Sequence, residues 1–88
     1  MTYGYVYILR CKDESLYTGW CIDLNKRLAL HNNGKGAKYT RSKRPCKLVY
    51  YEEINNKSEA LKREIAIKKL SKAQKEDLVR SFNKNYKL

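Results

Sequence analysis

The sequence lacks the marks of an exported, membrane-spanning or zinc-binding protein. No run approaches the ~18 apolar residues that a spanning helix needs, and the N-terminus has no charged head followed by an apolar stretch. The three cysteines, Cys11, Cys21 and Cys46, show no C-x-x-C spacing, and the only histidine is His31. These absences favour a cytoplasmic protein without a membrane segment, in which the thiols are free and buried.

Acidic residues are missing from the middle of the chain. Between Leu24 and Tyr51 there are eight lysines and arginines and no aspartate or glutamate. The whole chain carries a net charge of +11, from 20 basic and 9 acidic residues. A block of one sign is typical of a protein that binds a polyanion, although a charge that only confers solubility, or a ribosome-associated protein, would give the same pattern.

The chain is expected to form one domain over residues 1–88, since no internal repeat or low-complexity segment is visible. A domain of this size buries only about 60–65% of the surface of its unfolded chain, so its core must be thin. The hydrophobic fraction of 42%, which includes eight tyrosines, is sufficient for such a core.

Alternating apolar residues predict an antiparallel hairpin at the N-terminus. Residues 3–11 alternate with the two-residue period of a strand, and residues 16–21 form a second strand after a polar turn. Asp23 is a good N-cap for a helix that begins at Leu24 and is stopped by the polar and glycine residues at 32–34.

The second half of the chain is expected to hold one strand and two helices. Residues 48–51 form the third strand, residues 58–70 form a helix, and a capping box of Ser71 and Gln74 opens a last helix. Residues 32–47 form a long loop with six cations, and such loops are usually functional. The order β-β-α-β-α-α predicts an α+β domain, a small three-stranded antiparallel sheet flanked by about three helices.

Two polar residues lie on or beside the apolar face of the first predicted helix. Leu24, Leu28 and His31 share that face, with Arg27 at its edge. Arg27 and His31 are four residues apart, so they stand one above the other. A solvated cation would normally lie opposite the apolar face, so Arg27 either covers apolar surface with its stem or belongs to a functional site.

Glu64 is the third polar residue in an unexpected position. The packing face predicted for residues 58–70 consists of Ala60, Leu61, Ile65 and Lys68. Glu64 falls inside this face, where a carboxylate is costly unless it is paired or binds a metal. We therefore expect Glu64 either to pair with Arg27 or a nearby lysine, or to bind a cation.

The relative position of two strand tyrosines depends on the turn between the strands. If the turn holds an odd number of residues, Leu9 pairs with Tyr17 and Tyr7 with Gly19, and the two tyrosines project from one face. Gly19 would then leave room for a substrate beside Tyr7. An even number of residues would put the tyrosines on opposite faces, and core packing is the alternative role for both.

Several segments together resemble the GIY-YIG nuclease family. Residues Tyr5-Val6-Tyr7 and, ten residues later, Tyr17-Thr18-Gly19 resemble its paired signature, and the segments DLNKRLALH, GKGAKYT and SEALKRE follow at the family's spacing. The resemblance covers nearly the whole chain and is to the small stand-alone bacterial members. It implies a three-stranded antiparallel sheet flanked by helices, and hydrolysis of DNA that depends on a divalent metal.

The resemblance also implies roles for individual residues. By position, the catalytic residues are Tyr7, Tyr17, Arg27, His31 and Glu64. Glu64 would bind one Mg²⁺ or Mn²⁺, and the general base would be either Tyr17 or His31. Two positions depart from the pattern of some members: Trp20 replaces a lysine, and Glu76 replaces an active-site asparagine, for which Asn83 is no clear substitute.

The basic loop completes the expected interface with nucleic acid. Its candidate binding residues are Lys35, Lys38, Tyr39, Arg41, Lys43 and Arg44. Cations that contact phosphates carry no sequence information. The sequence therefore predicts an endonuclease with low intrinsic sequence specificity, acting on DNA rather than RNA; the alternative is a non-catalytic nucleic-acid-binding module on a nuclease fold.

Overall fold

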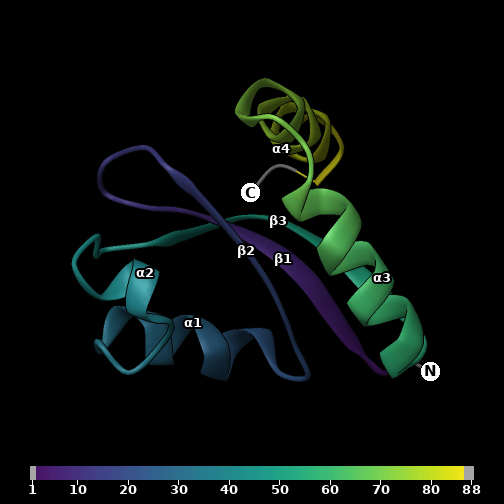
Figure 1. Cartoon of the computed structure of the whole chain (residues 1–88), viewed down its shortest axis with the longest axis horizontal. Coiled ribbons are helices and arrows are strands. Elements are labelled where there is room, and N and C mark those ends of the chain that lie inside the picture. The colour runs from purple at the N-terminus through teal and green to yellow at the C-terminus, as the bar shows by residue number, and fades with distance from the viewer. Residues whose placement is uncertain (1, 87–88) are drawn as a thin grey trace.

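The computed structural model describes residues 2–86, with side chains described as far as Phe82. The elements, in chain order (Figure 1), are β1 (Gly4–Arg10), β2 (Leu16–Cys21), α1 (Leu24–Asn32), α2 (Lys38–Arg41), β3 (Lys47–Ile54), α3 (Lys57–Lys68) and α4 (Lys72–Tyr86). The α+β class and the three-stranded antiparallel sheet are confirmed. The predicted order is also found, with α2 as an additional short helix after α1.

The sheet has the order β2-β1-β3, so the first strand is central and both of its neighbours are edge strands. In the β1–β2 hairpin, Leu9 lies opposite Tyr17 and Tyr7 opposite Gly19, which is the register expected for an odd turn. Tyr7 and Tyr17 therefore project from the same face of the sheet.

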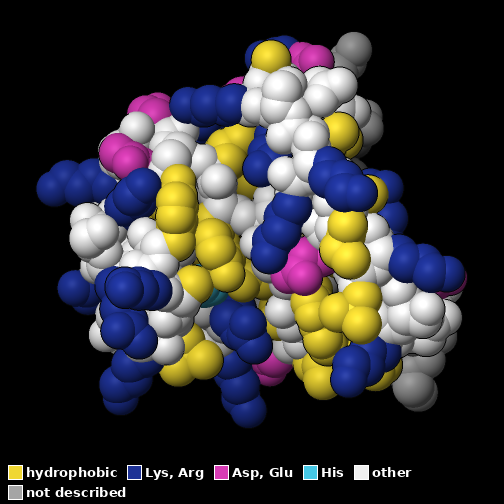
Figure 2. Space-filling model, viewed as in Figure 1, with side chains coloured by type: hydrophobic (Ala, Val, Ile, Leu, Met, Phe, Trp, Pro, Cys, Tyr) yellow, Lys and Arg dark blue, Asp and Glu magenta, His cyan; other side chains and the backbone are white. Residues whose placement is uncertain are grey.

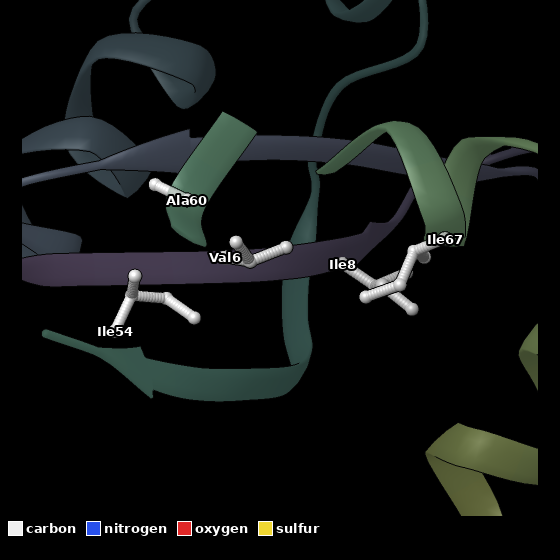
Figure 3. Close-up of a cluster of buried hydrophobic side chains, with 5 residues drawn as sticks. All are labelled: Val6, Ile8, Ile54, Ala60 and Ile67. Atoms are coloured by element: carbon white, nitrogen blue, oxygen red, sulfur yellow. The ribbon is translucent and has the colours of Figure 1, made fainter. Parts of the chain in front are cut away.

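Each face of the sheet has its own small core. On one face, Val6 and Ile8 of β1 pack with Ile54 of β3 and with Ala60 and Ile67 of α3 (Figure 3). The other face holds a second cluster, which contains Tyr7, Leu9, Cys11, Cys21 and Cys46 and is covered by Leu24 and Leu28 of α1. Helices α1 and α3 thus cover opposite faces. All three cysteines are free and buried, as predicted.

The predicted helix signals are confirmed by their hydrogen bonds. The Asp23 carboxylate accepts the backbone N–H of Lys26 at 3.0 Å at the start of α1. At the start of α4, the Gln74 side chain accepts the Ser71 N–H at 2.9 Å, and the Ser71 hydroxyl accepts the Gln74 N–H at 3.2 Å. No helix within the described residues is long and apolar enough to cross a membrane.

The predicted packing face of α3 is partly wrong. Leu61 and Ile65 are 40% and 54% exposed, whereas Ala60 and Ile67 are buried. A three-stranded sheet is too narrow to cover the wide apolar stripe of this helix. Glu64 lies between the two buried positions and keeps a side chain that is 20% exposed, so it does stand at the border of the packed face.

Two further differences concern the middle of the chain. Residues 32–47, predicted to be a loop, contain the one-turn helix α2, which tertiary contacts described below hold in place. Strand β3 is longer than predicted and runs to Ile54 through Glu52 and Glu53. Charged residues end a strand in most sequence patterns, but an edge strand tolerates them.

Candidate active site

The centre of the site is a histidine enclosed by hydroxyl groups. His31 is 2% exposed. Its Nε2 is hydrogen bonded to the Tyr7 hydroxyl at 3.0 Å, and its Nδ1 to the Thr40 hydroxyl at 2.8 Å. Tyr7 and Thr40 are themselves 1% and 0% exposed, so this chain of polar groups is closed to solvent.

Tyr17 covers the histidine on the side of strand β2. Its ring centroid lies 5.3 Å from that of His31 and 6.4 Å from that of Tyr7. Tyr39 of α2 stacks on Tyr17 at 5.8 Å and an interplanar angle of 27°, and remains 42% exposed. Tyr17 is half-buried, so it is the phenol of the pair that a substrate in solution can reach.

Two glycines leave the space that these rings occupy. A Cβ at Gly19 would lie 2.7 Å from the Tyr7 hydroxyl oxygen, and a Cβ at Gly36 would lie 2.4 Å from His31 Nδ1. Real Cβ atoms do not approach other atoms so closely. Gly19 thus makes room for a ring of the site itself, rather than for a substrate as the sequence suggested.

Arg27 places a positive charge beside the buried pair. It lines one small internal pocket with Tyr7, and its guanidinium donates to the carbonyl of Trp20 at 3.5 Å. Burial raises the pKa of Tyr7, the charge of Tyr17 adds to this, and Arg27 opposes it. Burial also lowers the pKa of His31, and the charge of Arg27 lowers it further, so both favour the neutral imidazole.

Glu64 lies on the other side of the sheet from this cluster. Its carboxylate is 3.6 Å from Lys68 Nζ, so its ion-pair partner is a lysine of its own helix and not Arg27. The flank of α3 that faces β3 carries Arg63, which pairs with Glu52 at 2.6 Å. At about 100° per residue, Glu64 lies on the opposite flank, toward edge strand β2. Tyr17 and Glu64 therefore lie on opposite sides of β2.

Glu64 is a suitable ligand only for an ion that keeps most of its water. No group of three or more His, Cys, Asp or Glu side chains that could hold a metal occurs among the described residues. A single, partly exposed carboxylate meets the preference of Mg²⁺ for one or two protein carboxylates and several waters. The donor set thus fits a single hydrated divalent ion and does not fit a zinc-type cage.

The basic loop residues fall into two groups. Lys35, Lys38 and Arg41 are exposed. Lys43, by contrast, lies 3.9 Å above the Tyr39 ring and 3.4 Å from Asp13, and Arg44 donates to the backbone carbonyl of Arg41 at 2.8 Å. The last two side chains contribute to the structure of the loop itself.

The distribution of side chains over one face agrees with a polyanion site. Figure 2 shows hydrophobic side chains gathered in the hollow between the α1–α2 side and the α3 side, with many Lys and Arg and a few acidic side chains around them. A pocket of about 460 Å³ opens beside Arg27, where Lys26 and the exposed apolar side chains of Ile22 and Leu30 also line it.

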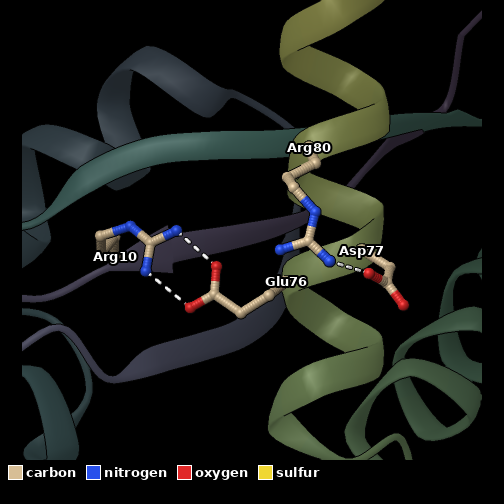
Figure 4. A network of polar contacts seen from close by, with 4 residues as sticks. All are labelled: Arg10, Glu76, Asp77 and Arg80. Carbon is tan, nitrogen blue, oxygen red and sulfur yellow. Dashed lines mark hydrogen bonds and ion pairs between the residues drawn. The ribbon is translucent and has the colours of Figure 1, made fainter.

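The two departures from the family pattern have structural roles. Glu76 accepts two hydrogen bonds from the Arg10 guanidinium, at 2.6 and 2.8 Å, which fix α4 to the end of β1 (Figure 4). Trp20 packs on the α3 side of the sheet and stacks with Tyr3 at 6.1 Å. The side chain of Asn83 lies outside the described residues.

Sequence reasoning missed Thr40 and Gly36. Both lie within the GKGAKYT segment, but nothing local distinguishes a threonine that bonds a histidine from any other threonine. The available signal was indirect: a buried histidine needs a partner for each ring nitrogen, and Thr40 is one of few neutral hydroxyls in the basic loop.

Comparison with known proteins identifies the family of the chain. The family model for the GIY-YIG catalytic domain matches residues 3–77, and the chain belongs to this family. Its relatives include a UPF0213 protein of Clostridium perfringens, 62% identical over 78 residues, covering 89% of this chain and 84% of that protein. A UPF0213 protein of Syntrophus aciditrophicus is 54% identical, covering 91% of this chain and 93% of the relative.

Two solved structures resemble the fold. The solution structure of a UPF0213 protein of Bacillus halodurans is 48% identical with a TM-score of 0.57, covering 88% of this chain and 82% of that one. The solution structure of a protein of E. faecalis is 40% identical with a TM-score of 0.61, covering 94% and 92% of the two chains.

Proposed function

We propose that the protein is an endonuclease that hydrolyses phosphodiester bonds in DNA with the help of one Mg²⁺ or Mn²⁺ ion. The observation that carries the proposal is the enclosed Tyr7–His31 hydrogen bond, with Tyr17 and Arg27 beside it, in segments that resemble the family's signature and within the range that the family model matches. A buried tyrosine–histidine pair next to an arginine has no evident use in a domain that only needs a core.

Arg27 and Tyr17 are the groups that would contact the phosphate. The planar guanidinium of Arg27 can bind two phosphate oxygens and stabilise the negative charge that develops as the nucleophile attacks. Tyr17 is half-buried, and its hydroxyl would orient the attacking water or accept its proton. A phenolate at this position would benefit from the cations around it.

His31 acts through Tyr7 rather than on water. Both of its ring nitrogens are already hydrogen bonded within the protein, and the residue is only 2% exposed. Of the two candidate bases, the geometry therefore favours Tyr17. The hydrogen-bonded pair of Tyr7 and His31 packs against the Tyr17 ring and holds it in place.

Glu64 is the proposed metal ligand. A bound divalent ion would neutralise phosphate charge and lower the pKa of a coordinated water. Glu64 would hold that ion from the α3 flank nearest β2, across the edge strand from Tyr17. The weak pair with Lys68, at 3.6 Å, leaves the carboxylate available.

Binding to DNA would use the exposed cations of the loop. Lys35, Lys38 and Arg41 are exposed and belong to a segment without acidic residues, so they suit a backbone contact that does not read sequence. The alternative of a binding module without catalysis has one observation in its favour: Glu76, at the position of the family asparagine, is occupied by Arg10.

A substrate screen separates the two functions. Purified protein is incubated with supercoiled, branched and single-stranded DNA and with RNA, each with Mg²⁺, Mn²⁺ or EDTA. The proposal requires cleavage of at least one DNA that EDTA abolishes. Binding without cleavage of any substrate would favour the non-catalytic alternative, and preferred cleavage of RNA would replace the DNA assignment.

A further inference from the structure

The hydroxyl of Thr40 has two partners but only one hydrogen. Its Oγ1 lies 2.9 Å from the carbonyl oxygen of Ala37 and 2.8 Å from Nδ1 of His31. A carbonyl oxygen can only accept, so the hydroxyl hydrogen is donated to Ala37. The lone pairs of Oγ1 are then free only to accept, and Nδ1 must carry the hydrogen that they receive.

This count of hydrogens fixes the rest of the chain. A neutral imidazole has one N–H, so Nε2 is without hydrogen when Nδ1 carries it. The Tyr7 hydroxyl, 3.0 Å from Nε2, is therefore the donor in that bond. Hydrogen bonds are thus donated by Tyr7 to His31, by His31 to Thr40, and by Thr40 to the backbone carbonyl of Ala37.

We infer that Thr40 is a positioning residue that holds His31 in the Nδ1–H form and so keeps Nε2 as the acceptor for the Tyr7 phenol. The assignment of the hydrogens rests on the contacts together with the neutral state of the buried ring; its consequence for catalysis rests on the proposed function. With the opposite form, Nε2–H would donate to Tyr7, and the phenol would lose its acceptor.

Thr40 belongs to a short helix that contacts both the site and the expected DNA surface. It follows Tyr39, which stacks on Tyr17, so two consecutive residues of α2 support both candidate bases. The same short helix begins with Lys38 and ends with Arg41, both exposed and proposed to contact phosphates. Helix α2 thus joins the part of the loop that would hold DNA to the groups that would act on it.

The chemical state of His31 can be read directly, because the chain has one histidine. In ¹⁵N-labelled protein at pH 7.5, long-range ¹H–¹⁵N spectra of the imidazole distinguish the protonated from the unprotonated nitrogen. Wild type should show Nδ1 protonated and Nε2 unprotonated. Thr40→Val keeps the shape but removes the acceptor, and should shift the ring toward the Nε2–H form or a mixture. Thr40→Ser should restore the wild-type spectrum.

Thr18→Val is the matched control. Thr18 is a second buried threonine, 3% exposed, whose hydroxyl has no hydrogen-bond partner among the described residues. Its replacement removes a buried hydroxyl without touching His31, and should leave the imidazole spectrum unchanged.

Two results would overturn the inference: an Nε2–H form in wild type, or an unchanged Nδ1–H spectrum in folded Thr40→Val. If Thr40→Val does not fold, the spectra of wild type and Thr40→Ser still test the inference. Both must show the Nδ1–H form, and an Nε2–H form in either would contradict it. Where cleavage is measurable, Thr40→Val should lose about 10- to 100-fold in rate, as removal of a group that orients a metal-binding histidine does, because in both cases the ring loses its fixed form. Thr40→Ser should stay near wild type. If the protein cleaves nothing, the proposed function is contradicted, but the position of the hydrogen on His31 is still determined by the spectrum.

Discussion

At the scale of single residues, the main feature of the site is one imidazole, that of His31, which is buried away from water. Tyr7, Thr40 and Gly36 enclose His31 and leave it 2% exposed. Burial costs a polar ring the full loss of its hydration unless each nitrogen finds a partner, and here each does. The enclosure predicts two measurable properties, one from packing and one from protonation.

The packing prediction concerns Gly36. Its alanine variant would bring a Cβ to 2.4 Å from His31 Nδ1, and neither the ring nor the helix behind it can move away without breaking hydrogen bonds. We expect Gly36→Ala to lose about 1–3 kcal/mol of stability through overpacking. Ala29→Ser, on the exposed side of α1, is the control and should change the urea midpoint little. A midpoint equal to wild type in Gly36→Ala would contradict the close approach.

The protonation prediction concerns acid stability. Burial, aided by Arg27, lowers the pKa of His31 in the folded protein, while the unfolded chain keeps a value of about 6.5. The unfolded state therefore binds more protons below pH 6.5. The contribution of the neutral His31 to stability should be fully present above that pH. It should decrease as the pH falls toward the folded pKa, by up to ~1.4 kcal/mol per pH unit.

Urea unfolding of wild type and His31→Gln between pH 7.5 and 5.0 measures this effect. The variant lacks the titrating ring, so its stability should depend less on pH in this window, in which carboxylates contribute little. Parallel curves for the two proteins would show that His31 protonates equally in both states.

At the scale of elements, what is local in the sequence was predictable and what is tertiary was not. Strand alternation in β1 and β2, the Asp23 cap and the Ser71–Gln74 capping box depend on neighbours a few residues apart, and all were correctly predicted. Helix α2 was missed because its one turn has no side-chain cap and is held by contacts of Tyr39 and Thr40 with residues far away in sequence.

The candidate site follows the same division. The positions of Arg27 and His31 on α1 could be predicted from helix periodicity, whereas the pairing of Tyr7 with Gly19 stayed open until the structure showed the turn to be odd. The exposure of Leu61 and Ile65 could not, because it depends on how much of α3 a narrow sheet covers. The hydroxyl partners of His31 could not be identified from the sequence either, because one of them, Thr40, lies in the basic loop, whose fold the sequence does not specify.

Helix α4 offers a prediction at this scale. Its bidentate pair between Glu76 and Arg10 is partly buried, with 23% of each side chain exposed, and lowers the pKa of Glu76 chiefly through the hydrogen bonds from Arg10. Glu76→Gln should therefore lower the urea midpoint more than Asp77→Asn, whose pair with Arg80 is mostly exposed. The difference should vanish in strong acid, where both carboxylates are protonated. Equal midpoints at neutral pH would mean that the pair does not anchor α4.

At the scale of the whole molecule, the charge of +11 should govern binding. Each phosphate that a cation neutralises releases condensed counterions, so the logarithm of affinity for duplex DNA should fall linearly with the logarithm of salt, at about −0.9 per phosphate. Replacing Lys35, Lys38 and Arg41 by alanine should make the slope shallower by roughly 0.9 for each phosphate that is no longer neutralised, and equally for unrelated sequences.

Fluorescence anisotropy at four salt concentrations with two unrelated duplexes measures the slope. The control removes the same charge elsewhere, by alanine at Lys57, Lys62 and Lys72, which are exposed on α3 and α4. If both triple variants flatten the slope alike, the net charge binds DNA and the loop has no special part in it.

A metal-dependent active site that spans edge strand β2 requires Glu64, and the decisive measurement is the rate of DNA cleavage at increasing Mg²⁺ in wild type, Glu64→Gln and Glu59→Gln. Both variants remove one carboxylate from α3, and Glu59 is exposed near the start of that helix. We expect Glu64→Gln to lose orders of magnitude in rate while it keeps the wild-type melting temperature, and Glu59→Gln to cut as wild type does. A folded Glu64→Gln protein that cleaves at the wild-type rate with the same Mg²⁺ dependence would contradict this expectation.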